Sequence, residues 1–414
     1  MKPNQAATTT TSRFDTIDVL RGLSIVAVVL LHTWLRFHFA GYDIGSALPH
    51  WFAGFLFSNG GNGVTVFFAV SGFLITTTSL RRFGSLADMK PGTFYRIRFA
   101  RIAPLLLLVL VVLSTLHLWN ASGFHINPRQ ATLPRALFAA LTFHLNWLEA
   151  AHGYLPANWD VLWSLSVEEM FYLFFPLLCV LLLRFKRTAK TGTGLFAGTL
   201  LLFIAMGPFA RTIWSIDGIA REKSYLSGMS AIAAGCLAAL LTERLQRYRT
   251  SPTSGARAAD GPSTLYPSTR YTATLIALQI VGTVLITWIA VWPPWHWMRY
   301  IGRSGVDDTI LAFATCLIMV ASVLRNRPGR TWTAPLRWFG RHSYEVYLTH
   351  EFIVVWGTAL YLKIHRGPLF IWLIAILLST AALGWAIAHY YSEPLNRAIR
   401  RRYPTSHLTC APRP

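Results

Sequence analysis

Arg21 and His32 are the first residues whose chemistry stands out, because both lie within the hydrophobic segment 17–35. His32 follows Arg21 by eleven positions, and at about 100° per residue this spacing places both side chains on one helix face. Ionisable groups inside a membrane span are costly and commonly mark functional sites. A buried histidine of this kind can act as a general base. The simpler alternative is a structural histidine that bonds to a neighbouring carbonyl.

Glu168 and Glu169 are adjacent carboxylates in another apolar segment, 161–183. A carboxylate that contacts a histidine can orient it as a base, so one of the two glutamates could pair with His32. Neighbouring residues on a helix point about 100° apart, so we expect only one glutamate to face the interior. Tyr172 follows about one turn later. The sequence leaves open which glutamate faces the site.

Arg98 and Arg101 could supply a phosphate site just before the apolar segment 102–119. Residues three apart share a helix face, and arginine binds phosphate through forked hydrogen bonds that lysine cannot reproduce. The simpler explanation is that these are the positive charges that mark the cytoplasmic end of a span. The sequence contains no Walker-type phosphate loop, HExxH motif or GxSxG elbow. We also expect no metal ion.

The composition determines the class of protein in which these residues act. Of the 414 residues, 53% are hydrophobic and only 13% are charged, which is typical of a polytopic membrane protein. The net charge of +21 comes from basic residues that lie between apolar runs, a pattern of membrane topology rather than of nucleic-acid binding. We therefore predict an all-α bundle of transmembrane helices and no nucleic-acid partner.

Lysine and arginine residues decide the predicted topology, because they accumulate in cytoplasmic loops. Their distribution favours about ten spans with both termini in the cytoplasm. If the weakly apolar stretch 133–148 crossed as well, the most basic loops would lie outside, so we predict a re-entrant or interfacial helix there. The predicted spans are 17–35, 64–80, 102–119, 161–183, 195–213, 226–242, 273–292, 308–324, 344–362 and 368–391.

The other segments are predicted to be polar and peripheral. We expect a disordered N-terminal tail at 1–13, a membrane domain at 14–396 and a basic cytoplasmic tail at 397–414. Within the domain, the Ser, Pro, Gly and Arg residues of 243–272 indicate a flexible cytoplasmic loop. The first hydrophobic segment lacks a small-residue cleavage site, so we expect a retained span rather than a signal peptide.

Several motifs along nearly the whole chain resemble the acyltransferase-3 family of membrane O-acyltransferases. The resemblance implies about ten spans and transfer of acyl groups, usually from acyl-CoA, to hydroxyls of sugars. Such sugars include those of lipopolysaccharide, exopolysaccharide, peptidoglycan and macrolides. The motifs are Arg-x10-His at 21–32, FFAVSGFLI at 67–75, Arg-x-x-Arg at 98–101, WSLSVEEMFYLFFP at 163–176, FGRHSYEVYLTHEF at 339–352 and YYSEPLNR at 390–397.

The same resemblance implies roles for the matching residues. His32 would deprotonate the acceptor hydroxyl, and Arg21 would position or polarise the donor. One departure is Met170, which stands where the family segment usually has glutamine. We also expect no fused hydrolase domain. In the remaining roles, Arg98 and Arg101 would hold the CoA phosphates, Glu168 or Glu169 would orient the site, and Ser71, Tyr172, Tyr347 and His350 would line it.

The sequence thus predicts an O-acyltransferase of the bacterial cytoplasmic membrane, surrounded by membrane lipids. It would move an acyl group, with acetyl-CoA as the expected donor, to a carbohydrate or glycolipid hydroxyl. The alternative is a proton-coupled transporter in which Arg21, His32 and Glu168 form a relay. Transporters commonly consist of two similar halves, and no such symmetry is evident here. The acceptor sugar, the acyl group and the oligomeric state remain open.

Overall fold

The computed structural model describes residues 14–46, 48–184, 189–214, 218–250, 269–291 and 304–401. The described residues form helices joined by turns and loops, with no strand among them, which confirms the predicted all-α class. The predicted tail at 1–13 lies outside these residues, as does 402–414 of the C-terminal tail. Helix α10 continues to Thr250 in the predicted loop at 243–272, and 251–268 also lies outside the described residues.

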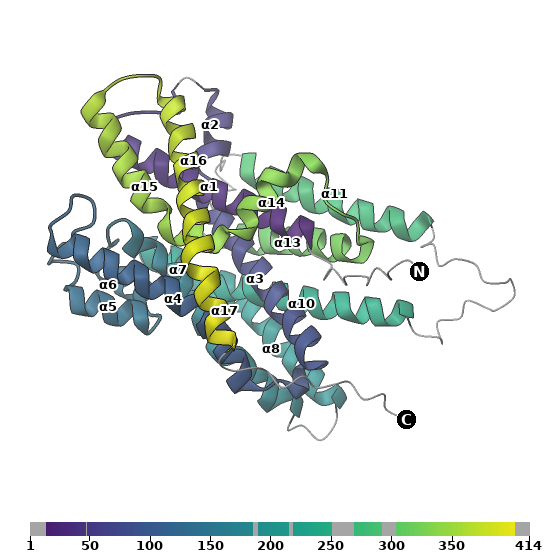
Figure 1. The fold of residues 1–414 in the computed structure, drawn as a ribbon. Helices are drawn as coiled ribbons and strands as arrows, with labels where there is room; N and C mark the ends of the chain where they lie inside the picture. Colours follow the sequence, from purple (N-terminus) through teal and green to yellow (C-terminus); the bar gives the residue numbers. More distant parts are fainter. Residues whose placement is uncertain are drawn as a thin grey trace, which may run out of the picture.

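The helices keep the labels of Figure 1. Three short π-helical turns, at Val180–Arg184, Ala210–Trp214 and Ala388–Ser392, extend α7, α8 and α16. In chain order the helices are α1 (Asp15–Phe39), α2 (His50–Phe57), α3 (Gly60–Phe83), α4 (Pro91–Leu118), α5 (Leu133–Leu141), α6 (Leu145–His152), α7 (Asn158–Cys179), α8 (Ala189–Phe209), α9 (Gly218–Glu222), α10 (Tyr225–Thr250), α11 (Thr269–Val291), α13 (Val306–Arg325), α14 (Ala334–Arg341), α15 (Ser343–Ile364), α16 (Leu369–Ile387) and α17 (Glu393–Arg401).

Nine helices in the described part of the chain are long and apolar enough to cross a membrane. They correspond to nine of the ten predicted spans. The tenth, 344–362, forms α15, whose 22 residues rise about 33 Å but include buried ionisable groups. The stretch 133–148 forms α5 and α6, of 9 and 8 residues. Each is too short to cross a hydrocarbon core of about 30 Å, in line with the prediction that this stretch does not cross.

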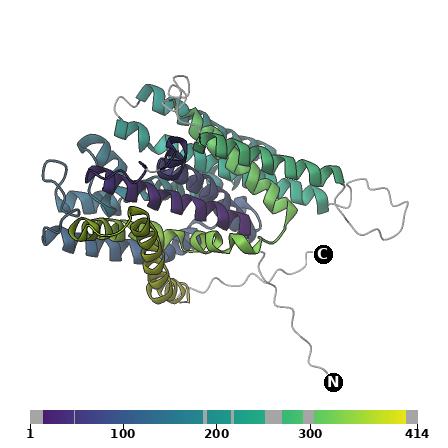
Figure 2. The same cartoon turned by 90° about the horizontal axis from the view of Figure 1, so that it is seen from above.

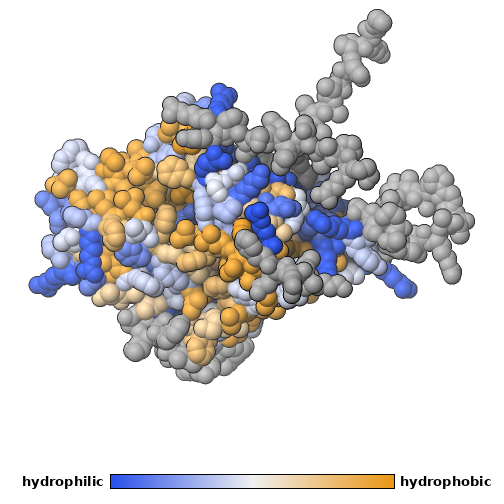
Figure 3. Space-filling model, turned by 90° about the horizontal axis from the view of Figure 1, so that it is seen from below, coloured by the Kyte–Doolittle hydropathy of each residue, from blue (hydrophilic) through white to orange (hydrophobic). Residues whose placement is uncertain are grey.

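Large apolar side chains are exposed on the outside of the bundle, where a soluble protein would present polar groups. Val111 of α4 is 64% exposed, Leu202 of α8 61% and Leu378 of α16 62%. Figure 3 shows apolar side chains gathered over the middle of one face, with hydrophilic groups toward both ends. An apolar belt of this kind matches the hydrocarbon region of a bilayer.

Helix α1 crosses the middle of the bundle and packs against α3, α14 and α15 (Figures 1 and 2). Its contact with α14 is close enough to require glycine on both sides. A Cβ atom at Gly22 would lie 1.9 Å from the carbonyl oxygen of Leu336, and one at Gly340 would lie 1.8 Å from that of Asp18. This close approach holds the start of α15, at Ser343, beside α1.

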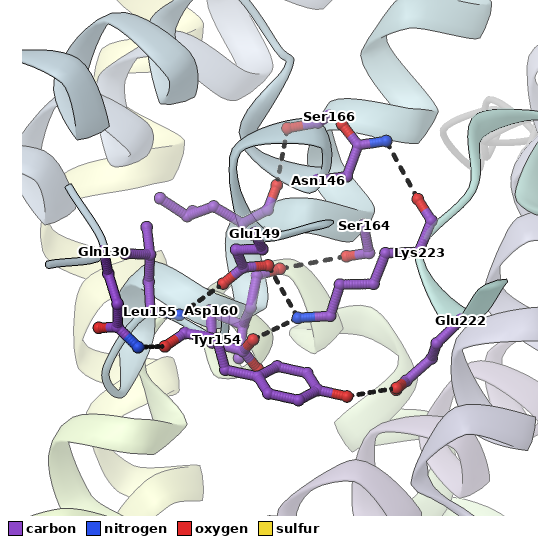
Figure 4. A network of polar contacts seen from close by, with 12 residues as sticks. Gln130, Asn146, Glu149, Tyr154, Leu155, Asp160, Ser164, Ser166, Glu222 and Lys223 are labelled. Atoms are coloured by element: carbon purple, nitrogen blue, oxygen red, sulfur yellow. Dashed lines mark hydrogen bonds and ion pairs between the residues drawn. The ribbon is translucent and has the colours of Figure 1, made fainter. Parts of the chain in front are cut away.

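A buried lysine joins three helices at the end of the bundle that carries α5 and α6 (Figure 4). Lys223 Nζ lies 2.8 Å from Glu149 Oε2 and forms a second ion pair with Asp160. The side chains of Lys223 and Glu149 are 1% and 0% exposed. Lys223 Nζ also lies 4.4 Å from the ring centroid of Tyr154, whose hydroxyl donates to Glu222. The network ties the short α6 to the starts of α7 and α10.

We predict that Lys223→Met lowers the stability of the fold, because it leaves the carboxylates of Glu149 and Asp160 without their shared cation. Removing one partner of a buried ion pair typically costs about 3–5 kcal/mol. Thermal unfolding in detergent, followed by tryptophan fluorescence, measures the change. Arg247→Gln is the control, because its pair with Glu243 is exposed and such pairs contribute little. Equal melting temperatures for both variants would contradict the prediction.

Candidate active site

A cavity of about 310 Å³ lies among α1, α3, α4, α7 and α15. Apolar side chains form much of its wall, including Phe67, Leu165 and Leu348. Of the residues predicted from the sequence to form the site, all except His32 and His350 line this cavity. They are Arg21, Ser71, Arg98, Arg101, Glu168, Glu169, Tyr172 and Tyr347.

Arg98 and the two glutamates form a network on one wall of the cavity. Arg98 Nη2 lies 2.9 Å from Glu169 Oε1 and 3.5 Å from Glu168 Oε1. Its guanidinium lies 3.8 Å from the ring centroid of Tyr172, a cation–π contact. Ser71 Oγ donates to Glu168, and the Tyr172 hydroxyl donates to the same carboxylate at 2.7 Å. Both glutamates therefore line the cavity, whereas the sequence suggested only one.

Arg21 and Arg101 add two further cations to the cavity wall. Arg21 Nη2 donates to Ser343 Oγ at 2.7 Å, and its Nη1 lies 3.9 Å from Asp18. Arg101 is exposed and forms no hydrogen bond or ion pair with any residue that the structure describes. Arg98 and Arg101 lie on the same helix, but only Arg98 has its charge balanced by carboxylates.

His32 forms an ion pair with Glu351 of α15. Its Nδ1 bonds to Glu351 Oε1, while Arg36 Nη2 lies 3.0 Å from Oε2 of the same carboxylate. The Glu351 side chain is only 1% exposed, so its charge needs these partners. An ionised carboxylate can only accept hydrogen bonds. The proton of a neutral His32 ring therefore resides on Nδ1, and Nε2 is left as the basic nitrogen.

The carboxylate partner of His32 differs from the one that the sequence suggested. Glu168 and Glu169 bond to Arg98 on the cavity wall, and Glu351 takes the position beside His32. The predicted site residues therefore divide into two groups, the cavity and the His32 pair.

His350 and Tyr347 lie between these two groups. The His350 ring centroid is 4.9 Å from that of His32, and the two rings meet edge to face. His350 Nδ1 donates to the main-chain oxygen of Tyr347 at 2.7 Å, while its buried Nε2 has no hydrogen-bond partner among the described residues. The Tyr347 hydroxyl bonds to Ser164 Oγ at 2.6 Å, and its side chain lines the cavity. Tyr347 thus contacts both groups.

His32, His350 and Glu351 could also be considered as metal ligands. One potential ligand atom from each lies within 4.8 Å of the others, and histidine with carboxylate is a common donor set for divalent metals. The Glu351 carboxylate is, however, shared between His32 and the guanidinium of Arg36. A second cation at this carboxylate would be repelled by that guanidinium. These contacts favour an organic base over a metal centre.

Sequence reasoning missed Glu351 and Arg36. Glu351 directly follows His350 inside the predicted span 344–362, so the rule that singled out Arg21 and His32 also applies to it. Arg36 lies one helical turn after His32 on α1. What the sequence could not supply is the contact itself, which joins residues 319 positions apart.

Curated proteins that are similar in sequence to this chain are named as O-acetyltransferases. The peptidoglycan O-acetyltransferase OatA of Listeria monocytogenes is 26% identical over 361 residues, which cover 83% of this chain and 49% of the relative. The protein named "Putative peptidoglycan O-acetyltransferase YrhL" of Bacillus subtilis is 24% identical over 93% of this chain and 56% of the relative. The chain thus spans about half the length of these relatives. No solved structure matches it.

The family comparison covers more of the chain than any one motif does. Residues 14–389 match the family described as an acyltransferase domain. This range runs from the residue before α1 to the turn that follows α16, and it contains the cavity and the His32 pair. Together with the apolar helices, the match makes this a multi-pass integral membrane protein. The chain belongs to the acyltransferase-3 family, whose motifs its sequence resembles.

Proposed function

We propose that the protein is an O-acetyltransferase that moves an acetyl group from cytoplasmic acetyl-CoA to a hydroxyl of a cell-envelope carbohydrate. The observation that carries this proposal is the His32–Glu351 pair beside a cavity with unbalanced positive charge. A base beside a cavity lined by cations is suited to the transfer of an acetyl group from an anionic carrier such as CoA. The family and the names of the relatives support the same reaction class.

His32 is the proposed general base. Its Nε2 takes the proton from the acceptor hydroxyl as the hydroxyl oxygen attacks the thioester carbonyl. The carbon–sulfur bond then breaks, the ester forms, and the CoA thiolate leaves with the proton that His32 holds. Glu351 keeps the imidazole oriented and stabilises its positive charge, as the acid does in other His–carboxylate pairs. Arg36 helps to keep Glu351 ionised.

The cavity is the proposed site for the donor. Arg98 is already neutralised by the two glutamates, so its proposed role is to hold them in the cavity wall. Arg101, which has no such partner, is better suited to bind a CoA phosphate. The thin pantetheine arm would then extend along the cavity, past Ser71, to the region of Tyr347.

The proposed orientation follows from the basic residues. With both termini in the cytoplasm of a bacterium, Arg101 lies near the inner end of α4. His32 then lies toward the outer end of α1. Donor and acceptor would approach from opposite sides, and only the acetyl group would need to cross the bilayer.

The reaction itself can be tested with purified protein in proteoliposomes. We expect labelled acetyl-CoA to yield free CoA and labelled carbohydrate when peptidoglycan fragments are offered as the acceptor.

His32→Ala should lower kcat by about 10²- to 10⁴-fold, the usual contribution of a general base. His38→Ala is the matched control, since His38 is an exposed histidine on the same helix. The assignment of His32 is wrong if both variants react at the wild-type rate. Proton-linked solute uptake without CoA release would favour a transporter instead.

Glu351→Gln tests the positioning role of the carboxylate. The amide keeps the size of the side chain but removes the negative charge that stabilises the imidazolium. We expect kcat to fall by about 10²-fold or more, while KM for acetyl-CoA stays close to the wild-type value. Steady-state kinetics with varied donor concentration separate the two constants. A higher donor KM with unchanged kcat would instead place Glu351 in donor binding.

A further inference from the structure

The amphipathic helix α17 packs on α4 (Figure 1), and a second hollow lies beside this contact. This groove has a volume of about 530 Å³ and lies between the end of α3, the start of α4 and α17. Arg82 of α3 and Arg400 of α17 both line it, and neither belongs to the motifs of the predicted site. Arg400 also lies beyond the part of the chain that matches the family.

Arg101 connects this groove to the donor cavity. Arg101 lies one helical turn after Ile97 of α4, which lines the groove together with Arg82 and Arg400. The positive charges of Arg101 and Arg82 both act on the guanidinium of Arg400. Arg101 is at the same time part of the cavity wall, where its charge acts on Arg21. Arginines therefore line both the exposed groove and the neighbouring wall of the cavity.

The three exposed arginines lack negative partners. Within the residues that the structure describes, Arg82, Arg101 and Arg400 form no ion pair and no hydrogen bond. Five of the more buried arginines are different, because each has a carboxylate within ion-pair distance. Arg82 and Arg400 line one groove, where their like charges repel one another, and a bound polyanion would relieve the repulsion. The pairs of the more buried arginines are Arg21–Asp18, Arg36–Glu351, Arg98–Glu169, Arg211–Asp308 and Arg337–Asp15.

We propose that Arg82, Arg101 and Arg400 form a binding site for the phosphate groups of a nucleotide-linked acyl donor, at the entrance to the cavity. The inference rests on the proposed function in taking acyl-CoA as the donor. CoA carries a 3′-phosphate and a diphosphate, and guanidinium groups bind such oxygens through forked hydrogen bonds. The carrier would remain in the groove while its thiol arm enters the cavity.

An anionic lipid headgroup offers the same phosphate chemistry. The apolar residues Ile97 and Phe99 of the groove would suit a lipid chain as well. The position of Arg101 favours the nucleotide, because this residue belongs to the wall of the donor cavity.

Steady-state kinetics with two donors, acetyl-CoA and acetyl-pantetheine, test the proposal. Arg82→Gln and Arg400→Gln should each raise KM for acetyl-CoA roughly tenfold or more, the usual effect of losing a charged hydrogen bond. The KM for acetyl-pantetheine, which lacks the nucleotide, should not change, and neither should kcat. Arg327→Gln is the control, because this exposed arginine follows α13 and lines neither the groove nor the donor cavity. The proposal is overturned if both donors are affected equally, or if neither is.

A binding measurement tests the phosphate site independently of the proposed transferase reaction. Adenosine 3′,5′-bisphosphate should bind the full-length protein in detergent by calorimetry, and Arg400→Gln should weaken its binding. If that pattern holds but no acyl-CoA is consumed, the phosphate site stands and the proposed transferase reaction fails. If the bisphosphate does not bind, and phosphatidylglycerol nanodiscs activate the wild type but not Arg400→Gln, the groove is a lipid site and the proposal is overturned.

Discussion

The arrangement of the site depends on one buried carboxylate. Glu351 is 1% exposed, and an isolated charge in such a place would cost far more than a single contact returns. Both of its ion-pair partners, His32 and Arg36, come from α1. The same charge balance that stabilises α15 beside α1 therefore fixes the ring of His32 and determines which of its nitrogens is basic. The same three side chains would therefore provide both stability and the proposed chemistry.

The rest of the site is organised around a different charge balance. Arg98 is held by Glu168 and Glu169, so the polar part of the cavity wall is nearly neutral at its centre. Positive charge remains unbalanced at Arg101 in the cavity wall and at Arg82 and Arg400 in the adjoining groove. Tyr347 lies between the cavity and the histidines, with its hydroxyl on Ser164 and its main-chain oxygen on His350. In the proposed reaction this separation keeps the carrier and the base apart, except where the acyl group passes between them.

Much of the fold and part of the site could be predicted from the sequence. Hydrophobic length gives the spans, and helical periodicity correctly groups Arg98 with Arg101 on the wall of one cavity. Periodicity cannot tell which helix a given face will meet, so the partner of His32 was sought at Glu168 or Glu169 instead of at Glu351. It also treats adjacent residues as facing apart, whereas the long Arg98 side chain reaches both glutamates. The groove was not foreseen, because Arg82 and Arg400 are distant in sequence.

The glycine contact between α1 and α14 limits how the protein can move. Gly22 and Gly340 bring the two backbones so close that neither helix can slide or turn against the other without a steric clash. We therefore expect α1 and α14 to move as one rigid body, so that His32 of α1 keeps its position relative to α14. Peripheral helices such as α11, which buries few of its side chains, are less constrained by packing. In the proposed reaction, the base would thus be carried on a fixed pair of helices, and any opening for substrates would come from the periphery.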